Sequence, residues 1–247
     1  MIRTVWFGLT ALGMTLFWGP AVLFAAAFGL RDEDWYMDVV RLWARTVMRA
    51  SGCRVVLHHP ERVAPGEPRV IVSNHVSWFD VFALAASLPG RFHFVAKKEL
   101  LKIPVFGPAM RAAGHITIDR SNRERAIESL REAGERIRRS PAVVVVYAEG
   151  TRSRDGRLQP FKKGAFMLAI ESRVPIVPLA VAGSYEIMPK GSWRIRPNTI
   201  HLHFLEPVPA AEVAAAASLG VEPLMERVRM AIASVVGDLE PALPPSR

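Results

Sequence analysis

The sequence predicts an α/β protein in which a central, mostly parallel or mixed β-sheet is flanked by helices and preceded by an apolar, membrane-anchoring helical segment. Three observations predict this fold class. Residues 5–30 contain no charged side chain. From residue 53 onward, short apolar runs alternate with amphipathic stretches of helical length. Residues 142–148, AVVVVYA, form a valine-rich run that is typical of a strand covered on both faces.

Length and composition narrow the class of protein. The chain has 247 residues, 50% of them apolar, which suits one α/β domain with a modest extension and excludes a disordered chain. Cys53 is the one cysteine, so no intramolecular disulfide can form. A formal net charge of +9 favours anionic partners: nucleic acid, anionic lipid headgroups or phosphorylated substrates. We expect membrane-anchoring helices over 1–50, one folded domain over 51–240 and a flexible tail over 241–247.

The uncharged N-terminal run is long enough to cross a bilayer core of ~30 Å. Pro20 lies inside it, which predicts a kink or break near Gly19 and Pro20. Only Arg3 precedes the run, and no small-residue cleavage site is evident before the acidic cluster at 32–34, so we expect a retained anchor rather than a cleaved signal peptide. The sequence leaves open whether the anchor spans the bilayer or re-enters the same leaflet.

Residues 34–50 form an amphipathic helical pattern with tryptophans on one side and arginines on another. Such a helix either packs against a protein core or lies in the lipid headgroup layer. Its position directly after the apolar run favours the headgroup layer.

The remaining elements follow in order along the chain. Strands are predicted at 53–59, 69–73, 91–97, 114–118, 142–148, 174–181 and 199–205, and helices at 78–88, 121–139, 164–172 and 210–236. Pro175 and Pro178 predict that the strand at 174–181 is an edge or bulged strand. In the strand at 199–205, His201 and His203 should face away from Ile200, Leu202 and Phe204.

His75 and Asp80 are the first candidate catalytic pair. Five residues apart on one helix they would point in different directions, but they can meet if His75 lies in a strand-to-helix turn and Asp80 in the first helical turns. A carboxylate on one imidazole nitrogen fixes the tautomer and leaves the other nitrogen as a general base. The alternative is a helix-capping cluster built on Ser73, Asn74 or Ser77, with His75 incidental.

A second candidate site follows the valine-rich strand, in the sequence YAEGTRSRDG at 147–156. Gly150 allows the backbone to approach a ligand closely, and a guanidinium such as that of Arg152 matches the oxygens of a phosphate. The alternative is a solvated charged turn. The site interpretation is favoured because the ends of buried strands carry the sites of α/β proteins.

Four blocks occur in order along the chain: NHVSWFD at 74–80, GHITIDR at 114–120, YAEGTRS at 147–153 and VPIVPLAV at 174–181. Together they resemble the glycerolipid acyltransferase family, specifically the bacterial 1-acyl-sn-glycerol-3-phosphate acyltransferases. The resemblance spans about residues 50–206 and favours the catalytic interpretation of His75 over the capping one. It implies that residues 51–240 are an acyltransferase domain.

The resemblance also implies roles for individual residues. His75 would be the general base and Asp80 its orienting partner. Lys97 and Arg120 would hold the phosphate of the acceptor. The remaining implied residues form the acceptor-binding loop: Glu149, Gly150, Thr151 and Arg152.

These roles predict a reaction. His75 takes the proton of the free hydroxyl of 1-acyl-sn-glycerol-3-phosphate (lysophosphatidic acid) as that hydroxyl attacks a thioester, and phosphatidic acid forms. No cofactor is expected; acyl-CoA or acyl carrier protein is the co-substrate, and membrane lipids are the other partners. Because these donors are water-soluble, we expect the domain on the cytosolic face of the inner (cytoplasmic) membrane.

Several alternatives remain. Another lyso-lipid acceptor, such as a lyso-ornithine lipid, would leave Arg120 and Arg152 harder to explain. A non-catalytic lipid-binding protein would need no defined geometry between His75 and Asp80. A nucleic-acid partner is not expected, because acidic residues are spread among the basic ones and an apolar anchor comes first. No metal is expected either, since the histidines at 58, 59, 201 and 203 lack an evident further ligand and are interpreted as partly exposed strand residues.

Overall fold

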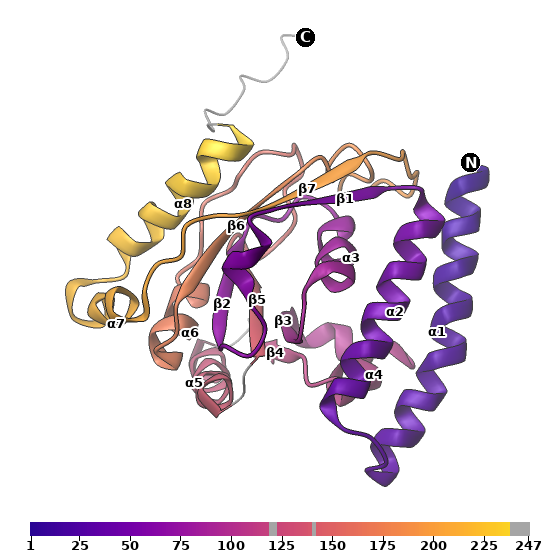
Figure 1. Cartoon of the computed structure of the whole chain (residues 1–247), viewed down its shortest axis with the longest axis horizontal. Helices are drawn as coiled ribbons and strands as arrows, with labels where there is room; N and C mark the ends of the chain where they lie inside the picture. Colours follow the sequence, from indigo (N-terminus) through magenta and orange to yellow (C-terminus); the bar gives the residue numbers. More distant parts are fainter. Residues whose placement is uncertain (119–122, 140–141, 238–247) are drawn as a thin grey trace.

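A computed structural model describes residues 1–118, 123–139 and 142–237. Its core is a seven-stranded sheet with helices on both faces (Figure 1). The strands are β1 (Arg54–His58), β2 (Arg69–Ser73), β3 (Arg91–Lys97), β4 (Ile116–Ile118), β5 (Ala142–Tyr147), β6 (Ile176–Ala182) and β7 (Thr199–Phe204). The α-helices are α1 (Ile2–Phe28), α2 (Glu33–Ser51), α3 (Trp78–Ser87), α4 (Phe106–Ala112), α5 (Arg123–Arg139), α6 (Gly164–Ser172), α7 (Ala210–Leu219) and α8 (Glu222–Val236), with short 3₁₀ turns at Pro60–Val63 and Lys98–Lys102.

The strands lie in the order β1-β7-β6-β2-β5-β3-β4. The β6–β7 pair is antiparallel and the other described pairs are parallel, so the sheet is mixed, as predicted. β2 and β5 are buried along their whole length in the middle of the sheet. Their carboxyl ends therefore open onto the same edge, where α/β proteins bind ligands.

Each face of the sheet carries its own apolar core, because alternate residues of a strand point to opposite faces. On β5, Val143 and Val145 join the core beneath α1, α2 and α3, while Val144 and Val146 join the core beneath α5, α6, α7 and α8. Figure 1 shows this division, with α1–α4 on one side of the sheet and α5–α8 on the other.

The prediction for β6 is wrong: it is neither an edge nor a bulged strand but lies inside the sheet, between β7 and β2. Pro178 is tolerated there because no neighbouring strand needs the backbone N–H that proline lacks. Its carbonyl accepts from the N–H of Leu205, beyond the end of β7, at 2.8 Å. The N and C=O groups of one strand residue point to the same side, so the absent N–H of Pro178 also faces the side where β7 has already ended.

Two other predicted elements differ from the structure. The final helix predicted over 210–236 is two helices, α7 and α8, separated at Gly220, whose φ is +95°. α1 is helical through Pro20, without the predicted break. The capping box predicted from Ser121 lies outside the described residues.

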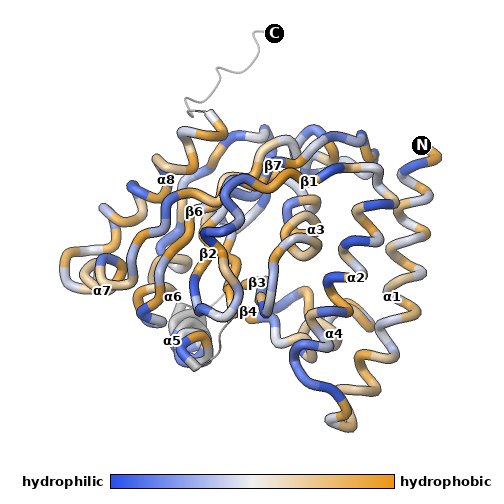
Figure 2. The backbone as a smooth tube through the Cα atoms, in the orientation of Figure 1, coloured by the Kyte–Doolittle hydropathy of each residue, from blue (hydrophilic) through white to orange (hydrophobic). Residues whose placement is uncertain are grey.

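α1 is long and apolar enough to cross a membrane by length and composition. It also lies along the folded domain. Thr4 accepts from the N–H of Ile195 at 3.1 Å, the ring of Phe7 lies 5.4 Å from that of Phe79, and Trp43 of α2 donates to Thr15 at 3.0 Å. The opposite side of α1 is apolar and exposed, as the hydropathy colouring of Figure 2 shows along the helix.

α2 packs between α1 and α3, which favours the core-packing interpretation of residues 34–50 over the headgroup layer. Two of its arginines are used inside the protein. Arg41 donates to the carbonyls of Leu88 and Gly90 at 3.2 and 2.6 Å, and Arg45 donates to the carbonyl of Ala86 at 3.0 Å. They therefore satisfy the carbonyls that remain open at the C-terminal end of α3.

Candidate active site

His75 and Asp80 meet at the carboxyl end of β2. The chain leaves the sheet at Ser73, turns through His75, and enters α3 with Ser77 as its N-cap. The Nδ1 atom of His75 lies 2.7 Å from Oδ2 of Asp80. The carboxylate therefore fixes the ring with its hydrogen on Nδ1 and leaves Nε2 as the proton-accepting nitrogen.

Asp80 is fully buried, and every contact at its carboxylate is a donor. Oδ2 also accepts from the backbone N–H groups of Val76 and Ser77 at 2.8 and 2.9 Å, and Oδ1 accepts from the hydroxyl of Ser184. The capping interpretation is therefore correct, and the same carboxylate that caps α3 also orients the ring of His75, as the catalytic interpretation requires.

The floor of the site is made by β5. The ring of Tyr147 stacks on the imidazole of His75, with centroids 3.9 Å apart and planes inclined by 16°. Glu149 follows, and its Oε1 accepts from the backbone N–H of His75 at 2.9 Å. Burial raises the pKa of the Glu149 carboxyl to about 8, so it is largely protonated at neutral pH.

Glu149 was predicted to bind substrate, but its carboxyl group is buried behind His75 and does not line the cavity described below. Its hydrogen bond instead fixes the backbone that carries His75. The rest of the predicted loop does reach the cavity: Gly150, Thr151 and Arg152. Gly150 has a φ of +75°, a backbone conformation that favours glycine.

Basic side chains surround the cavity mouth. Lys97, at the end of β3, and Arg152 line it. Both were predicted to bind substrate, and that role stays a prediction. The guanidinium carbon of Arg152 lies 4.8 Å from the centroid of the Trp78 ring, which fixes the plane of the guanidinium. Arg120, the other predicted phosphate ligand, lies outside the described residues.

Lys190 is a basic residue of this rim that the motifs did not reveal. Its ammonium donates to the hydroxyl of Thr151 and the carbonyl of Arg152 at 3.1 and 3.0 Å. Desolvation, followed by repulsion from Arg154, Arg152 and Lys97, lowers the pKa of Lys190. Because Lys190 follows β6 in a loop with no motif of its own, only the fold brings it here.

An apolar cavity of ≈ 570 Å³ extends from His75 between the helices. This volume is within the ~300–1,000 Å³ typical of small-molecule sites. Four helices form its walls, through residues that include Trp18 of α1, Val39 of α2, Phe82 and Ala85 of α3, and Ala109 of α4. The site thus combines a positioned imidazole, a basic rim and a long apolar chamber.

Comparison with known proteins places this arrangement in a family. The acyltransferase family model matches residues 54–182, which contain β1 to β6 and every described residue of the predicted site. The chain therefore belongs to the acyltransferase family.

Two similar proteins carry the name of the same enzyme activity. The 1-acyl-sn-glycerol-3-phosphate acyltransferase of Limnanthes douglasii is 42% identical over 139 residues, which are 56% of this chain and 50% of that protein. The 1-acyl-sn-glycerol-3-phosphate acyltransferase alpha of Homo sapiens is 35% identical over 173 residues, 70% of this chain and 61% of that protein. The chain spans about half to three fifths of the length of these relatives.

A solved structure extends the likeness to nearly the whole fold. The crystal structure of the 1-acyl-sn-glycerophosphate (LPA) acyltransferase PlsC from Thermotoga maritima superposes with a TM-score of 0.78 at 27% sequence identity. The match covers 97% of each chain, and so includes the N-terminal helices as well as the sheet.

Proposed function

We propose that this protein transfers a fatty acyl group from a thioester to the free hydroxyl of 1-acyl-sn-glycerol-3-phosphate, giving phosphatidic acid. The observation that carries the proposal is the meeting of three features at one point. His75 with its buried Asp80, the basic rim and the apolar cavity adjoin one another. They match the three parts of the reaction: a hydroxyl to deprotonate, a phosphate to hold and an acyl chain to accommodate.

The proposed mechanism is direct transfer by general-base catalysis. Nε2 of His75 takes the proton of the acceptor hydroxyl as the hydroxyl oxygen attacks the thioester carbonyl. Buried Asp80 stabilises the imidazolium that forms, as the carboxylate of a catalytic triad does. The tetrahedral intermediate then collapses, the C–S bond breaks, and the thiolate takes up a proton as the free thiol. No acyl-enzyme is required.

The rim gives the acceptor its orientation. Arg152, Lys97 and Lys190 present cationic groups beside the cavity mouth. A guanidinium can bind two phosphate oxygens at once, while the lysines add charge without a fixed geometry. This arrangement favours a phosphate-bearing acceptor over a lyso-ornithine lipid.

The apolar cavity gives the acyl chain a place to lie. Its walls are formed by α1, α2, α3 and α4, and it begins at His75. A chain that enters with its carbonyl beside His75 would bury its methylene groups at about 0.8 kcal/mol each. Both acyl-CoA and acyl carrier protein remain possible donors, because each presents the same thioester.

We further propose that α1 enters one leaflet of the membrane rather than spanning it. Its inner side is fixed to the domain from Thr4 to Trp18, so a spanning orientation would carry α2 and α3 into the bilayer with it. Its exposed side is apolar, with Leu9, Leu12 and Leu16 each more than half exposed. Seated in this way on the cytosolic face of the inner membrane, the protein would meet its acceptor in the leaflet and its donor from the cytosol.

The test is an acyl-transfer assay with the purified chain in lipid vesicles. Radiolabelled acyl-CoA and acyl carrier protein thioesters are each combined with 1-acyl-sn-glycerol-3-phosphate, a lyso-ornithine lipid and a neutral lyso-lipid. We expect labelled phosphatidic acid with at least one donor. Product only from a phosphate-free acceptor would replace the proposed substrate, and no product from any pair would favour a lipid-binding protein without catalysis.

A further inference from the structure

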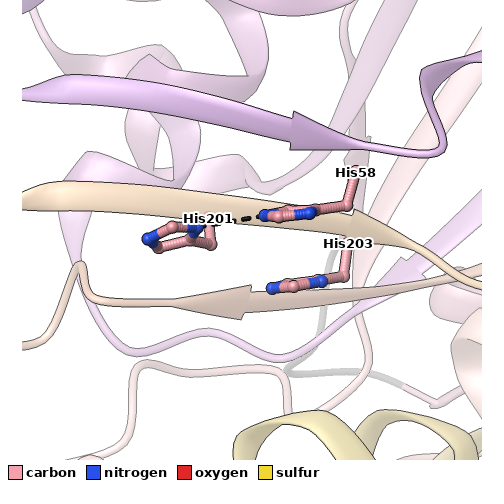
Figure 3. Close-up of side chains that lie close together, drawn as sticks. All are labelled: His58, His201 and His203. Carbon is pink, nitrogen blue, oxygen red and sulfur yellow. Dashed lines mark hydrogen bonds between the residues drawn. The ribbon is translucent and has the colours of Figure 1, made fainter.

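Three histidines gather on the sheet at a place that the proposed acyl transfer does not use. They are His58 of β1 and His201 and His203 of β7 (Figure 3). One ring nitrogen of each lies within 4.8 Å of the nitrogens offered by the other two. His58 Nε2 is 3.0 Å from His201 Nδ1, and the rings of His58 and His203 stack with centroids 3.9 Å apart.

The register of the sheet produces this cluster. His58 lies directly opposite His203 on parallel strands, and His201 is two residues before His203, so all three face the same side. On the adjacent strand β6, Ala180 and Ala182 lie opposite His203 and His201, so small side chains border the cluster on that side. His58 therefore brings a third imidazole to the pair, although it lies 143 residues from His201 in sequence.

We propose that His58, His201 and His203 bind a zinc-type divalent transition-metal cation that fastens the edge strand β1 to β7. Imidazole nitrogens are preferred ligands of such ions, and three of them leave the fourth tetrahedral position to water. Zn–N bonds of ~2.0–2.1 Å place tetrahedral nitrogens ~3.3 Å apart, which is close to the 3.0 Å between His58 Nε2 and His201 Nδ1. Binding requires the stacked rings of His58 and His203 to turn out of the stack, so that their nitrogen lone pairs point to one ion.

The hydrogen bond between two of the rings can be replaced by metal ligation. In the metal-free protein His58 and His201 share one hydrogen between their facing nitrogens. On ligation, that hydrogen moves to the other nitrogen of its own ring, and both facing nitrogens become free to bind.

The site would act on stability rather than on chemistry. β1 is the outermost strand, pairs with β7 and directly follows α2, so it connects the N-terminal helices to the sheet. A cation that binds the folded state and not the unfolded one raises stability with its free concentration. A hard cation such as Mg²⁺ prefers oxygen ligands and should not substitute.

Calorimetric titration of the full chain in detergent with ZnCl₂ tests the proposal, with MgCl₂ as the comparison. We expect saturable binding of one zinc ion per chain, no magnesium binding, and a rise in Tm with zinc. His201→Ala should weaken zinc binding by more than ~100-fold, beyond the ~10- to 100-fold loss seen when a residue supporting a metal ligand is removed. His58→Gln, on the other strand, is a second variant in case the first does not fold.

His59→Asn is the matched control, because it removes an adjacent histidine that lies outside the cluster and keeps a residue tolerant of the positive φ of 57° there. It should bind zinc like the wild type. All variants should retain acyl transfer without zinc. The proposal is overturned if the wild type shows no saturable zinc binding, or if His201→Ala and His58→Gln bind zinc as the wild type does, or if His59→Asn loses binding as they do.

Discussion

The arginine of the loop at 149–152 shows how the surroundings of a side chain can suit it to a role. Arg152 is half-buried, its guanidinium lies over Trp78, and burial lowers its pKa without removing its charge. Lys190 donates to the backbone carbonyl of the same residue and so supports the loop while adding a second cation. These contacts hold two cationic groups close together, as the proposed phosphate site requires.

Replacing either cation should affect the acceptor more than the donor. We expect Arg152→Ala to raise the KM for 1-acyl-sn-glycerol-3-phosphate by ~10- to 100-fold, which corresponds to the free energy lost with a hydrogen bond to a charged group. Lys190→Ala should raise it less, because an ammonium offers no bidentate geometry. Arg131→Ala on α5 is the control for loss of one positive charge, since Arg131 is exposed and pairs with Glu128. Unchanged acceptor KM in both test variants would argue against a phosphate site here.

The buried Glu149 predicts a pH dependence of stability. Its pKa is about 8 in the folded protein, against an ordinary value of 4.5, so between these values the unfolded chain has lost a proton that the folded protein keeps. The contribution of Glu149 is therefore fully present below pH 4.5 and is lost as pH rises to about 8, by ~1.4 kcal/mol per pH unit.

Glu149→Gln should remove this slope while keeping an oxygen that accepts from the N–H of His75. The measurement is Tm as a function of pH in detergent, and the quantity of interest is the difference between variant and wild type, which cancels the other titrating groups. We expect the variant to gain stability relative to the wild type as pH rises from about 4.5 to 8. A difference that stays constant with pH would show that Glu149 is ionised in the folded protein.

At the scale of elements, α1 has two different sides. One side packs on α2, α3 and α4, and the other side exposes large apolar side chains. Leu9 is 60% exposed, and Leu12 and Leu16 are each 57% exposed. Exposed leucines in a row along one helix are costly in water and favourable in a lipid leaflet.

Changing these three leucines to serine should weaken membrane binding. We expect the fraction of protein bound to vesicles to fall by about tenfold or more, since each leucine contributes on the order of 1 kcal/mol or more when it is buried. Activity in mixed detergent micelles should remain. Leu219→Ser on α7 is the control, because Leu219 is 77% exposed on an element far along the chain. If the triple variant bound vesicles as well as the wild type, the proposed insertion of α1 into the leaflet would be contradicted.

The four helices around the cavity should together determine which length of acyl chain the protein prefers. Trp78 begins α3 beside His75, and Ala85 lies seven residues further on, ~10 Å along the helix axis. Ala85→Phe would therefore fill the cavity away from the base. We expect the ratio of kcat/KM for long over short acyl-CoA to fall, whereas Ala215→Phe on exposed α7 should leave it unchanged. A preserved ratio for Ala85→Phe would mean that the acyl chain lies elsewhere.

At the scale of the whole molecule, most strands and helices were predictable because their apolar periodicity survives in the fold. β2, α3 and β5 begin and end within a residue or two of the prediction. The position of β6 in the sheet was predicted wrongly because the sequence shows that Pro178 lacks a backbone N–H. It does not show whether a neighbouring strand has a carbonyl that needs this donor. α2 was assigned to the headgroup layer because the carbonyls of α3 that bind Arg41 and Arg45 are 41 to 49 residues away in sequence.

The candidate site was predictable only where a motif carried it. His75 and Asp80 are five residues apart across one strand-to-helix turn, a spacing from which the sequence could suggest their contact. Lys190, Ser184 and the stacked Tyr147 reach the same point from β6 and β5, and His58 reaches His201 from another strand. These contacts form because strands far apart in sequence pair in the sheet, so sequence spacing alone does not predict them.

The whole account depends on His75 acting as a base held by Asp80. The most direct measurement is kcat of the purified chain with acyl-CoA and 1-acyl-sn-glycerol-3-phosphate, for His75→Ala and for the control His59→Asn. We predict that His75→Ala loses ~10²- to 10⁴-fold in kcat, the contribution of a general base, while its Tm and its binding to vesicles stay near those of the wild type. A folded His75→Ala protein that turns over at a rate close to the wild type would contradict the account.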